Sequence, residues 1–289
     1  MPSHSLKRGF QLTEGDVEIL THVYQLRLST IDHLVALTGR PRFALNRRLL
    51  KLTENKYLYC KRRRFEKYVY TINRAAGSIL VERGIASPEV VNLRVRLHEL
   101  TDLFLSHALM LTDIHVVLKL VSRESPIKLV EWREGKELYE SVTVYEAGER
   151  VKLPVRPDAF FTLQDTRREG YDLMGFFLEA DRSTTTNKRF QKKIKGYSAY
   201  FEQGRYTEKY GFKGARVVTV TLTEARAVNL CAASREVLPS GNARFYYFTS
   251  TKHFSFENPA QILDAIFISP KDFDTDMRYS LTPPLPSSG

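Results

Sequence analysis

The spacing of apolar residues changes near Pro126, and this change constrains the fold more than any other feature of the chain. Over most of the preceding residues, apolar side chains recur at intervals of three and four, which is the period of a helix with one buried face. After Pro126, short β-like runs such as IKLVEWRE and ARVVTVTLT appear, with helical stretches between them. We therefore predict an α+β or α/β protein in which a mainly helical part precedes a domain with a mixed sheet.

Residues 13–72 carry the pattern of helices followed by a pair of strands. Thr13 and Asp16 resemble a capping box at the start of the first helix, and the third helix runs from about Pro41 to Asn55. The runs YLYCK and KYVYTI then read as strands joined by RRRFE. This order predicts a winged helix-turn-helix, whose third helix enters the major groove of DNA while the hairpin reaches phosphates.

The excess of positive charge lies in the same part of the chain. Residues 1–74 hold 15 Lys+Arg against 6 Asp+Glu, whereas the remaining residues hold 29 against 27. A localised basic field is typical of a module that binds a polyanion, so double-stranded DNA is the expected partner. Winged helices also serve as protein-interaction modules, usually with neutral or acidic third helices, whereas this third helix and hairpin are strongly basic.

Side chains of the third helix and the hairpin are the predicted DNA contacts. Arg42, Asn46 and Arg47 are predicted at base edges, because Arg and Asn pair bidentately with guanine and adenine. The arginine triplet of the hairpin is predicted to bind phosphates. The complete predicted set is Arg40, Arg42, Asn46, Arg47, Arg48, Lys51, Arg62, Arg63 and Arg64.

Turn residues and changes of pattern divide the chain into expected parts. A connecting helix as long as the one expected here can pair with a copy of itself, which favours a homodimer. The expected parts are a flexible amino terminus over 1–12, a winged helix over 13–86, a long connecting helix over 87–122, a mixed-sheet domain over 123–278 and a disordered tail over 279–289.

The composition excludes several other classes of protein. No uninterrupted apolar stretch reaches the length that spans a membrane, and the first residues lack the apolar core of a secretion signal. Cys60 and Cys231 lie far apart, without partners at the spacing of a metal site. These properties predict a cytoplasmic protein without a membrane segment, a disulfide framework or a zinc site.

Acidic residues of the second part lie where strands are expected to meet. Asp158 follows Pro157 in VRPDAFF, and Glu179 and Asp181 end the run YDLMGFFLEAD. If these runs pair as neighbouring strands, Asp158 and Glu179 converge at one end of the sheet. Converging carboxylates are the ligands that Mg²⁺ prefers, and Mg²⁺ can activate water for phosphodiester cleavage. The alternative is structural, because acids before a helix start interact favourably with the helix dipole.

Pro157-Asp158 and Glu179 resemble the first two parts of the PD-(D/E)xK motif of restriction-endonuclease-like proteins. The resemblance implies a restriction-endonuclease-like fold, with Asp158, Glu179 and Asp181 as metal ligands and a catalytic lysine. Asp181 stands at the position where that lysine is usual. Some members of the fold carry the lysine on the following helix, where Lys193 lies closest to the buried face. Either Lys193 serves as the catalytic lysine, or the fold is retained without catalysis.

The joined pattern is more specific than either half. A winged helix, a long helix, RPDA, FFLEADRST and a lysine-rich helix together resemble the replication-relaxation family of plasmids, integrative conjugative elements and related mobile DNA of bacteria. The resemblance covers roughly residues 12–210. It implies a role in replication or DNA relaxation at an origin, with a relaxase or replication proteins as partners. The alternatives are an active Mg²⁺-dependent endonuclease and a winged-helix transcriptional repressor.

Overall fold

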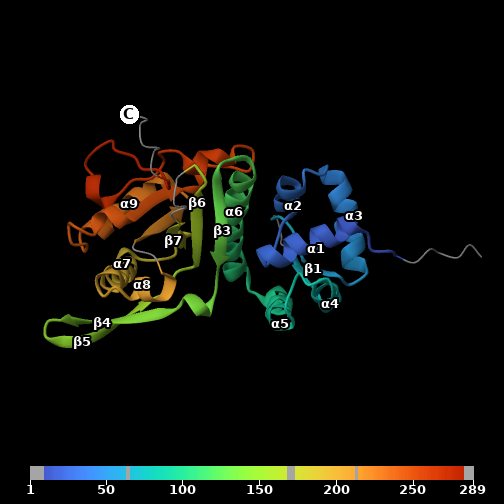
Figure 1. The fold of residues 1–289 in the computed structure, drawn as a ribbon, viewed down its shortest axis with the longest axis horizontal. Coiled ribbons are helices and arrows are strands. Elements are labelled where there is room, and N and C mark those ends of the chain that lie inside the picture. The colour runs from blue at the N-terminus through green and yellow to red at the C-terminus, as the bar shows by residue number, and fades with distance from the viewer. Residues whose placement is uncertain (1–9, 63–65, 168–172, 212–213, 283–289) are drawn as a thin grey trace, which may run out of the picture. The chain divides into compact units, whose positions relative to one another are not determined.

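The computed structural model describes residues 10–62, 66–167, 173–211 and 214–282, and the chain divides into two compact units, Met1–Val116 and Val117–Gly289. The first unit is mainly helical, and the second contains a mixed β-sheet (Figure 1). The predicted α+β class, with a helix-rich amino-terminal part before a mixed-sheet part, is confirmed.

The first unit begins with helices that are followed by a hairpin, in the predicted order. The elements are α1 (Glu14–Leu26), α2 (Ile31–Thr38), α3 (Arg42–Glu54), β1 (Leu58–Lys61) and β2 (Val69–Ile72). A capping box begins α1, because Thr13 N–H donates to the Asp16 carboxylate at 2.8 Å while Asp16 N–H donates to the Thr13 hydroxyl at 3.3 Å. Gly39 ends α2 in the left-handed conformation, with φ 65°, which suits a residue without a Cβ.

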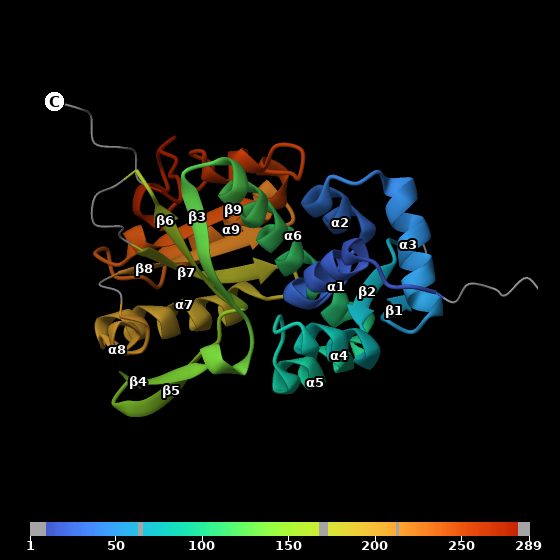
Figure 2. The same ribbon diagram turned by 45° about the vertical axis from the view of Figure 1, so that its right-hand side comes forward.

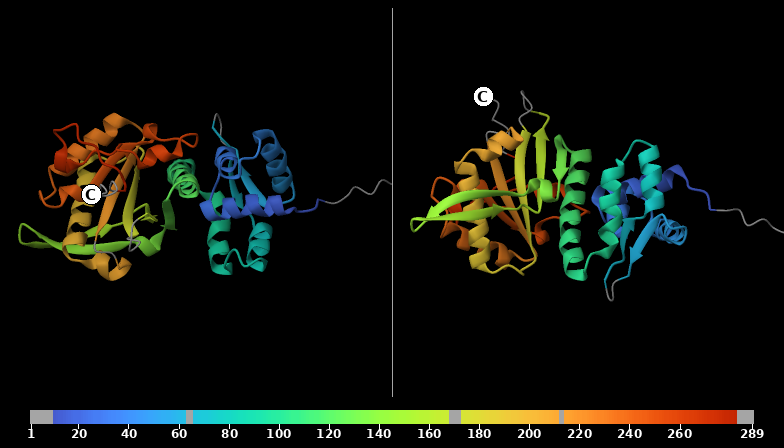
Figure 3. Two further views of the ribbon diagram at one scale, coloured as in Figure 1. Left: turned by 45° about the horizontal axis from the view of Figure 1, so that its top comes forward. Right: turned by 90° about the horizontal axis from the view of Figure 1, so that it is seen from below.

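An apolar core holds these elements together with α4 (Arg74–Glu82) and α5 (Pro88–Val95). One apolar stripe of α3 is buried, since Leu45, Leu49 and Leu52 are each at most 1% exposed. The helices α4 and α5 lie side by side (Figure 3). Their close approach brings the backbone of α4 against Val91 of α5 at a position where the sequence has Gly77.

The single connecting helix expected over residues 87–122 is not formed. The helix α5 ends at Val95, a 3₁₀ turn covers Arg96–Glu99, and α6 (Asp102–Glu124) begins after an extended Leu100. Contacts from the hairpin hold this break, because Lys61 Nζ donates to the Leu100 carbonyl at 2.6 Å. The His98 ring also stacks on Tyr59 with centroids 4.0 Å apart. The apolar period continues through the break, so periodicity alone could not detect it.

By length and composition, α6 is the one helix of the described residues that is apolar enough to cross a membrane. However, 61% of its most apolar window is buried inside the structure. Leu111, Ile114 and Val117, for example, are at most 5% exposed. Burial of this kind is typical of a core helix.

The second unit is built on a sheet with strand order β3-β6-β7-β8-β9. The strands β3, β6 and β7 pair antiparallel, whereas β7, β8 and β9 run parallel. A separate hairpin of β4 and β5 extends along α7 (Figure 2). The bounds are β3 (Ile127–Arg133), β4 (Glu140–Glu146), β5 (Glu149–Val155), β6 (Ala159–Asp165), β7 (Leu173–Asp181), α7 (Asn187–Glu202), α8 (Arg205–Tyr210), β8 (Ala215–Thr221), α9 (Glu224–Arg235) and β9 (Tyr246–Ser250).

The central strand β7 buries side chains on both faces of the sheet. On one face Phe177 packs against Tyr197 of α7, with ring centroids 5.7 Å apart. On the other face Phe176 stacks on Phe161 of β6 at 4.9 Å. Figure 2 shows α7 running beside this sheet. Because side chains alternate along a strand, Glu179 and Asp181 lie on the same face as Phe177, which packs against α7.

The described ends of the chain are more ordered than the sequence suggested. Phe10, expected within a flexible segment, packs on Tyr57 with centroids 5.8 Å apart, and Arg48 lies over its ring. Tyr279, expected within a disordered tail, forms an antiparallel bridge with Phe267, and Leu281 is 1% exposed. Apolar burial explains both differences, because each segment carries large side chains that fill the edge of a core. Residues 1–9 and 283–289 lie outside the described residues.

Gly196 of α7 gives a direct test of how this helix is seated. A Cβ at this position would lie 2.9 Å from the backbone oxygen of Pro154 in β5, and backbone cannot swing away as a flexible side chain can. We expect Gly196→Ala to lower the free energy of unfolding by about 1–3 kcal/mol. The exposed Lys192→Ala on the same helix should stay within about 0.5 kcal/mol of wild type. Urea unfolding of both variants makes the comparison, and equal stability of the two would contradict this packing.

Candidate functional sites

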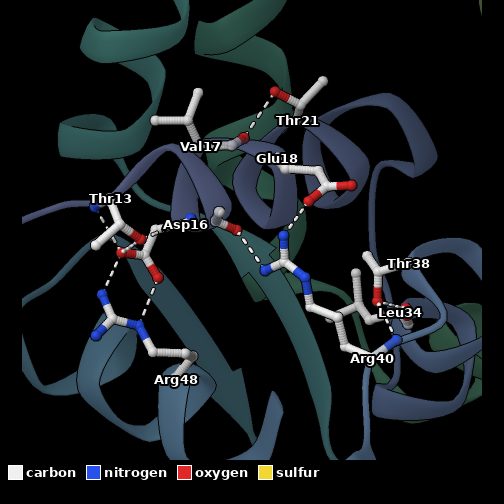
Figure 4. Close-up of polar contacts among 10 residues, drawn as sticks. Thr13, Asp16, Val17, Glu18, Thr21, Leu34, Thr38, Arg40 and Arg48 are labelled. Atoms are coloured by element: carbon white, nitrogen blue, oxygen red, sulfur yellow. Dashed lines mark hydrogen bonds and ion pairs between the residues drawn. The ribbon is translucent and has the colours of Figure 1, made fainter. Parts of the chain in front are cut away.

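A buried acid of the first unit anchors α3. Asp16 is 1% exposed, and both of its carboxylate oxygens accept bonds from the Arg48 guanidinium, with Nε 2.6 Å from Oδ1 (Figure 4). Burial alone would raise the pKa of Asp16, but the hydrogen bonds from Arg48 and Thr13 outweigh it and hold the pKa below its ordinary value. The same carboxylate therefore caps α1 and fixes α3 against it.

Two further arginines of the predicted DNA-binding set are paired in the same way. Arg40 donates to the Gly15 carbonyl at 3.0 Å and forms an ion pair with Glu18 (Figure 4). Arg42 forms an ion pair with Asp32 of α2, and Asp32 also binds Lys67 of the hairpin. These contacts join the helices to the hairpin and offset part of the positive charge of the unit.

Other members of the predicted set lie on the outward face of α3. Asn46, Arg47 and Lys51 are exposed, and in the described residues their side chains have no hydrogen-bond or ion-pair partner. Phe43 and Leu50 lie on the same face and are 75% and 55% exposed. These apolar side chains were not among the predicted contacts, although their positions outside the buried stripe of leucines mark them as exposed.

The described part of the hairpin contributes one predicted contact. Arg62 follows β1, is exposed, and lies over the ring of Tyr68, 5.8 Å from its centroid. Arg63 and Arg64 lie outside the described residues.

A second candidate site lies at one end of the sheet in the second unit. The antiparallel register of β6 and β7 pairs Ala159 with Leu178, which brings Asp158 next to the end of β7. Asp158 N–H donates to the Leu178 carbonyl at 3.0 Å, and its carboxylate accepts from the Ala180 N–H at 2.9 Å. Asp158 and Glu179 thus lie close together, and the charge of Asp158 contributes to the raised pKa of Glu179.

Glu179 is buried and bound by α7. It is 2% exposed and accepts hydrogen bonds from Lys193 Nζ and from the Tyr197 hydroxyl, the latter at 2.6 Å. Burial raises the pKa of Glu179 to about 7, against the opposing charge of Lys193. Burial would lower the pKa of Lys193, but the charges of Glu179 and Asp158 raise it, so the ammonium keeps its proton. The helix thus brings both Lys193 and Tyr197 to Glu179.

Asp181 has a different set of partners. Its Oδ2 accepts from Arg226 Nε of α9 at 2.7 Å and from Ser183 N–H at 3.0 Å. Arg226 also donates to Asn187 Oδ1 at 3.1 Å, so the pair joins the starts of α7 and α9. Asp181 Oδ1 is buried and has no hydrogen-bond partner in the described residues. Arg226, which lies outside the PD-(D/E)xK motif, therefore binds Asp181, the residue at the position where that motif usually has its lysine.

The structure places the three carboxylates that were predicted as magnesium ligands in different surroundings. In the described part of the chain, no group of three His, Cys, Asp or Glu side chains is placed to hold a metal ion. Lys193 and Tyr197 occupy the oxygens of Glu179, and Arg226 neutralises Asp181. The cluster that remains is a carboxylate pair, Asp158 and Glu179, with one lysine.

The fold and the two sites define an α+β protein with a basic helical unit before a mixed-sheet unit that buries a carboxylate–lysine cluster. The sequence model of the replication-relaxation family matches residues 20–215, which is more than half of the chain. The chain therefore belongs to the replication-relaxation family, and the resemblance drawn from the sequence is confirmed. No curated protein and no solved structure matched the chain.

The raised pKa of Glu179 predicts how stability depends on pH. The folded state holds this proton up to about pH 7, whereas the unfolded chain releases it near 4.5, so the folded state binds more protons between these values. The contribution of Glu179 to the free energy of unfolding should therefore fall as pH rises from about 4.5 to 7. Urea unfolding across this range should show that fall in wild type, and Glu179→Gln should remove it.

The exposed Glu149 of the β4–β5 hairpin provides a matched control. Glu149→Gln should leave the pH dependence of wild type in place. A Glu179→Gln variant with the same pH dependence as wild type would contradict the raised pKa.

Proposed function

We propose that this protein binds double-stranded DNA through α3 and the β1–β2 hairpin, which act as a winged helix. The single observation that carries the proposal is the division of the basic residues of α3 into two groups. Arg42 and Arg48 are tied to acids of α1 and α2, whereas Arg47 and Lys51 project from the outward face without acidic partners in the described residues. A helix held rigidly with donors directed outward is preorganised for a ligand.

The types of side chain on that face fit a DNA groove. Asn46 and Arg47 offer the donors and acceptors that pair with adenine and guanine edges, and Lys51 offers a charge for a phosphate. Phe43 and Leu50 are apolar and exposed, and such groups contact thymine methyls. Arg62, with Arg63 and Arg64 beyond the described residues, supplies the hairpin contact to the backbone.

Membership of the replication-relaxation family supports a role for this DNA binding in mobile DNA. We propose that the protein acts in the cytoplasm, in replication or DNA relaxation at an origin on a plasmid or integrative conjugative element. A relaxase or replication proteins would be its partners, and a homodimer would match a site with two half-sites. If the bound site lay over a promoter, the transcriptional repressor would be the correct alternative.

The second unit supports a second candidate function, a Mg²⁺-dependent endonuclease of the restriction-endonuclease-like class. The observation that favours it is the convergence of Asp158, Glu179 and Lys193, with the lysine supplied by the following helix. The contacts of Glu179 with Lys193 and Tyr197 oppose it, because a carboxylate engaged in this way is not presented to a metal. We therefore propose that this unit is a nuclease-like scaffold.

The outward face of α3 can be tested with single substitutions. Arg47→Ala and Lys51→Ala should each weaken binding to duplex DNA and reduce the slope of log K against log salt by about 1 where a phosphate contact is lost. Fluorescence anisotropy at several salt concentrations gives both quantities. Arg74→Ala removes another exposed arginine, from α4, and should change neither quantity. Equal effects of Arg47→Ala and Arg74→Ala would contradict the proposed interface.

The scaffold proposal predicts binding without cleavage. Supercoiled plasmid incubated with the protein and Mg²⁺ or Mn²⁺ should remain uncut, while a gel shift on the same DNA persists. Nicking by the wild type that is lost in Asp158→Asn, Glu179→Gln and Lys193→Met, with the gel shift retained, would instead establish the endonuclease.

A further inference from the structure

A cavity of about 350 Å³ lies at the end of the sheet where β7 and β8 begin. Arg216 pairs in register with Phe176 of β7, so its side chain lies on the face opposite Phe177, Glu179 and α7. The cavity is therefore separate from the carboxylate–lysine cluster. Its chemically informative lining residues are Arg216, Arg244, Lys271, Phe245, Tyr247 and Tyr279.

The two arginines of the cavity lie against aromatic rings. Arg216 lies over Tyr247, with Cζ 5.4 Å from the ring centroid, and Arg244 lies over Phe245 at 4.8 Å. Tyr247 is itself held by Tyr279, which stacks on it at 5.2 Å. Stacking uses the flat face of a guanidinium and leaves its in-plane N–H donors available. In the described residues neither arginine has a carboxylate partner, so these donors lack an acceptor.

The cavity also has a net positive lining. No Asp or Glu is among the described residues that line it. Asp272 lies beside the lining, where it accepts a hydrogen bond from the Tyr279 hydroxyl and lies 3.7 Å from Lys271 Nζ. A concave site with fixed, unpaired guanidinium donors and an added ammonium favours an anion, and the fork of an arginine matches a phosphate in particular.

The rest of the lining selects against a bare inorganic anion. Leu173, Met174 and Phe245 give the cavity an apolar side, and Leu173 is 40% exposed. A volume of about 350 Å³ falls in the range of small-molecule sites, about 300–1,000 Å³, and exceeds what one phosphate fills. The ligand that fits carries both a phosphate and a flat, largely apolar group.

We propose that this cavity binds a nucleotide, with its phosphate on Arg216 and Arg244 and its base against the apolar side. The nucleotide is either free or the phosphorylated end of a DNA strand, because the two share this chemistry. Such a site would give the second unit a contact with nucleic acid that does not depend on α3.

The test measures binding of dTMP, of 5′-phosphorylated (dT)₆ and of inorganic phosphate to the full chain by isothermal titration calorimetry at low ionic strength. Wild type should bind dTMP or the oligonucleotide at least tenfold more tightly than inorganic phosphate. Tighter binding of dTMP identifies a free nucleotide as the ligand, and tighter binding of the oligonucleotide identifies a strand end; either result supports the proposal. If neither dTMP nor the oligonucleotide binds, or if inorganic phosphate binds as tightly as they do, the proposal is overturned.

Variants connect the binding to the named side chains. Arg216→Ala/Arg244→Ala, and Arg244→Ala alone, should weaken nucleotide binding at least tenfold and at least threefold, respectively. Arg244 is exposed, so its single variant keeps the fold even if the double variant does not. Lys188→Ala/Lys192→Ala removes two exposed charges from α7 of the same unit and should change the affinity less than twofold. Equal losses in Arg244→Ala and this control would show that net charge, and not the cavity, binds the nucleotide.

A gel shift with duplex DNA separates this inference from the proposed function. Arg244→Ala should retain the shift, because the proposed duplex contacts lie on α3 and the hairpin. A protein that binds nucleotide but no duplex would contradict only the winged-helix proposal, and the reverse result would contradict only the cavity.

Discussion

Burial of the Glu179 carboxylate is the constraint on which the second unit depends. A carboxylate removed from water must be protonated, paired or hydrogen-bonded, and here α7 supplies both an ammonium and a hydroxyl. Lys193 and Tyr197 lie one helical turn apart, so their joint contact with one side chain sets the rotation and the height of α7 over the sheet. The same contacts occupy both carboxylate oxygens of Glu179, so they limit its ability to bind a ligand.

The first unit follows the same physical rule with a different outcome. Asp16 is as buried as Glu179, and its partner is Arg48 of α3. That pairing uses basic residues for the architecture of the unit and leaves a smaller outward set, with Arg47 and Lys51 at its centre. The net charge alone therefore overstates how much positive charge is available to a ligand, because acids of the same unit already pair with part of it.

Much of the fold was predictable because its signals are local. Capping residues, the leucine stripe of α3 and the turn at Gly39 act within a few residues, and the order of helices and hairpin followed from them. The break at Leu100 was not predictable, because Lys61 and Tyr59, distant in sequence, hold it. In the candidate site, the approach of Lys193 to Glu179 followed from helical geometry. Arg226 did not, because it reaches Asp181 from a helix that no motif connects to β7.

The sequence by itself determined the class of fold, the basic amino-terminal unit, the family and the identity of the acids at the sheet end. These depend on periodicity, composition and short motifs, which are properties of the chain read in order. Only the tertiary structure decided which charges remain available, since pairing depends on distances between residues far apart in the chain. In the structure Arg48 is paired with an acid whereas Arg47 is directed outward, and Asp181 is paired with Arg226 whereas Asp158 lies beside Glu179. The structure also places Arg216 and Arg244 around one cavity, which no sequence pattern indicates.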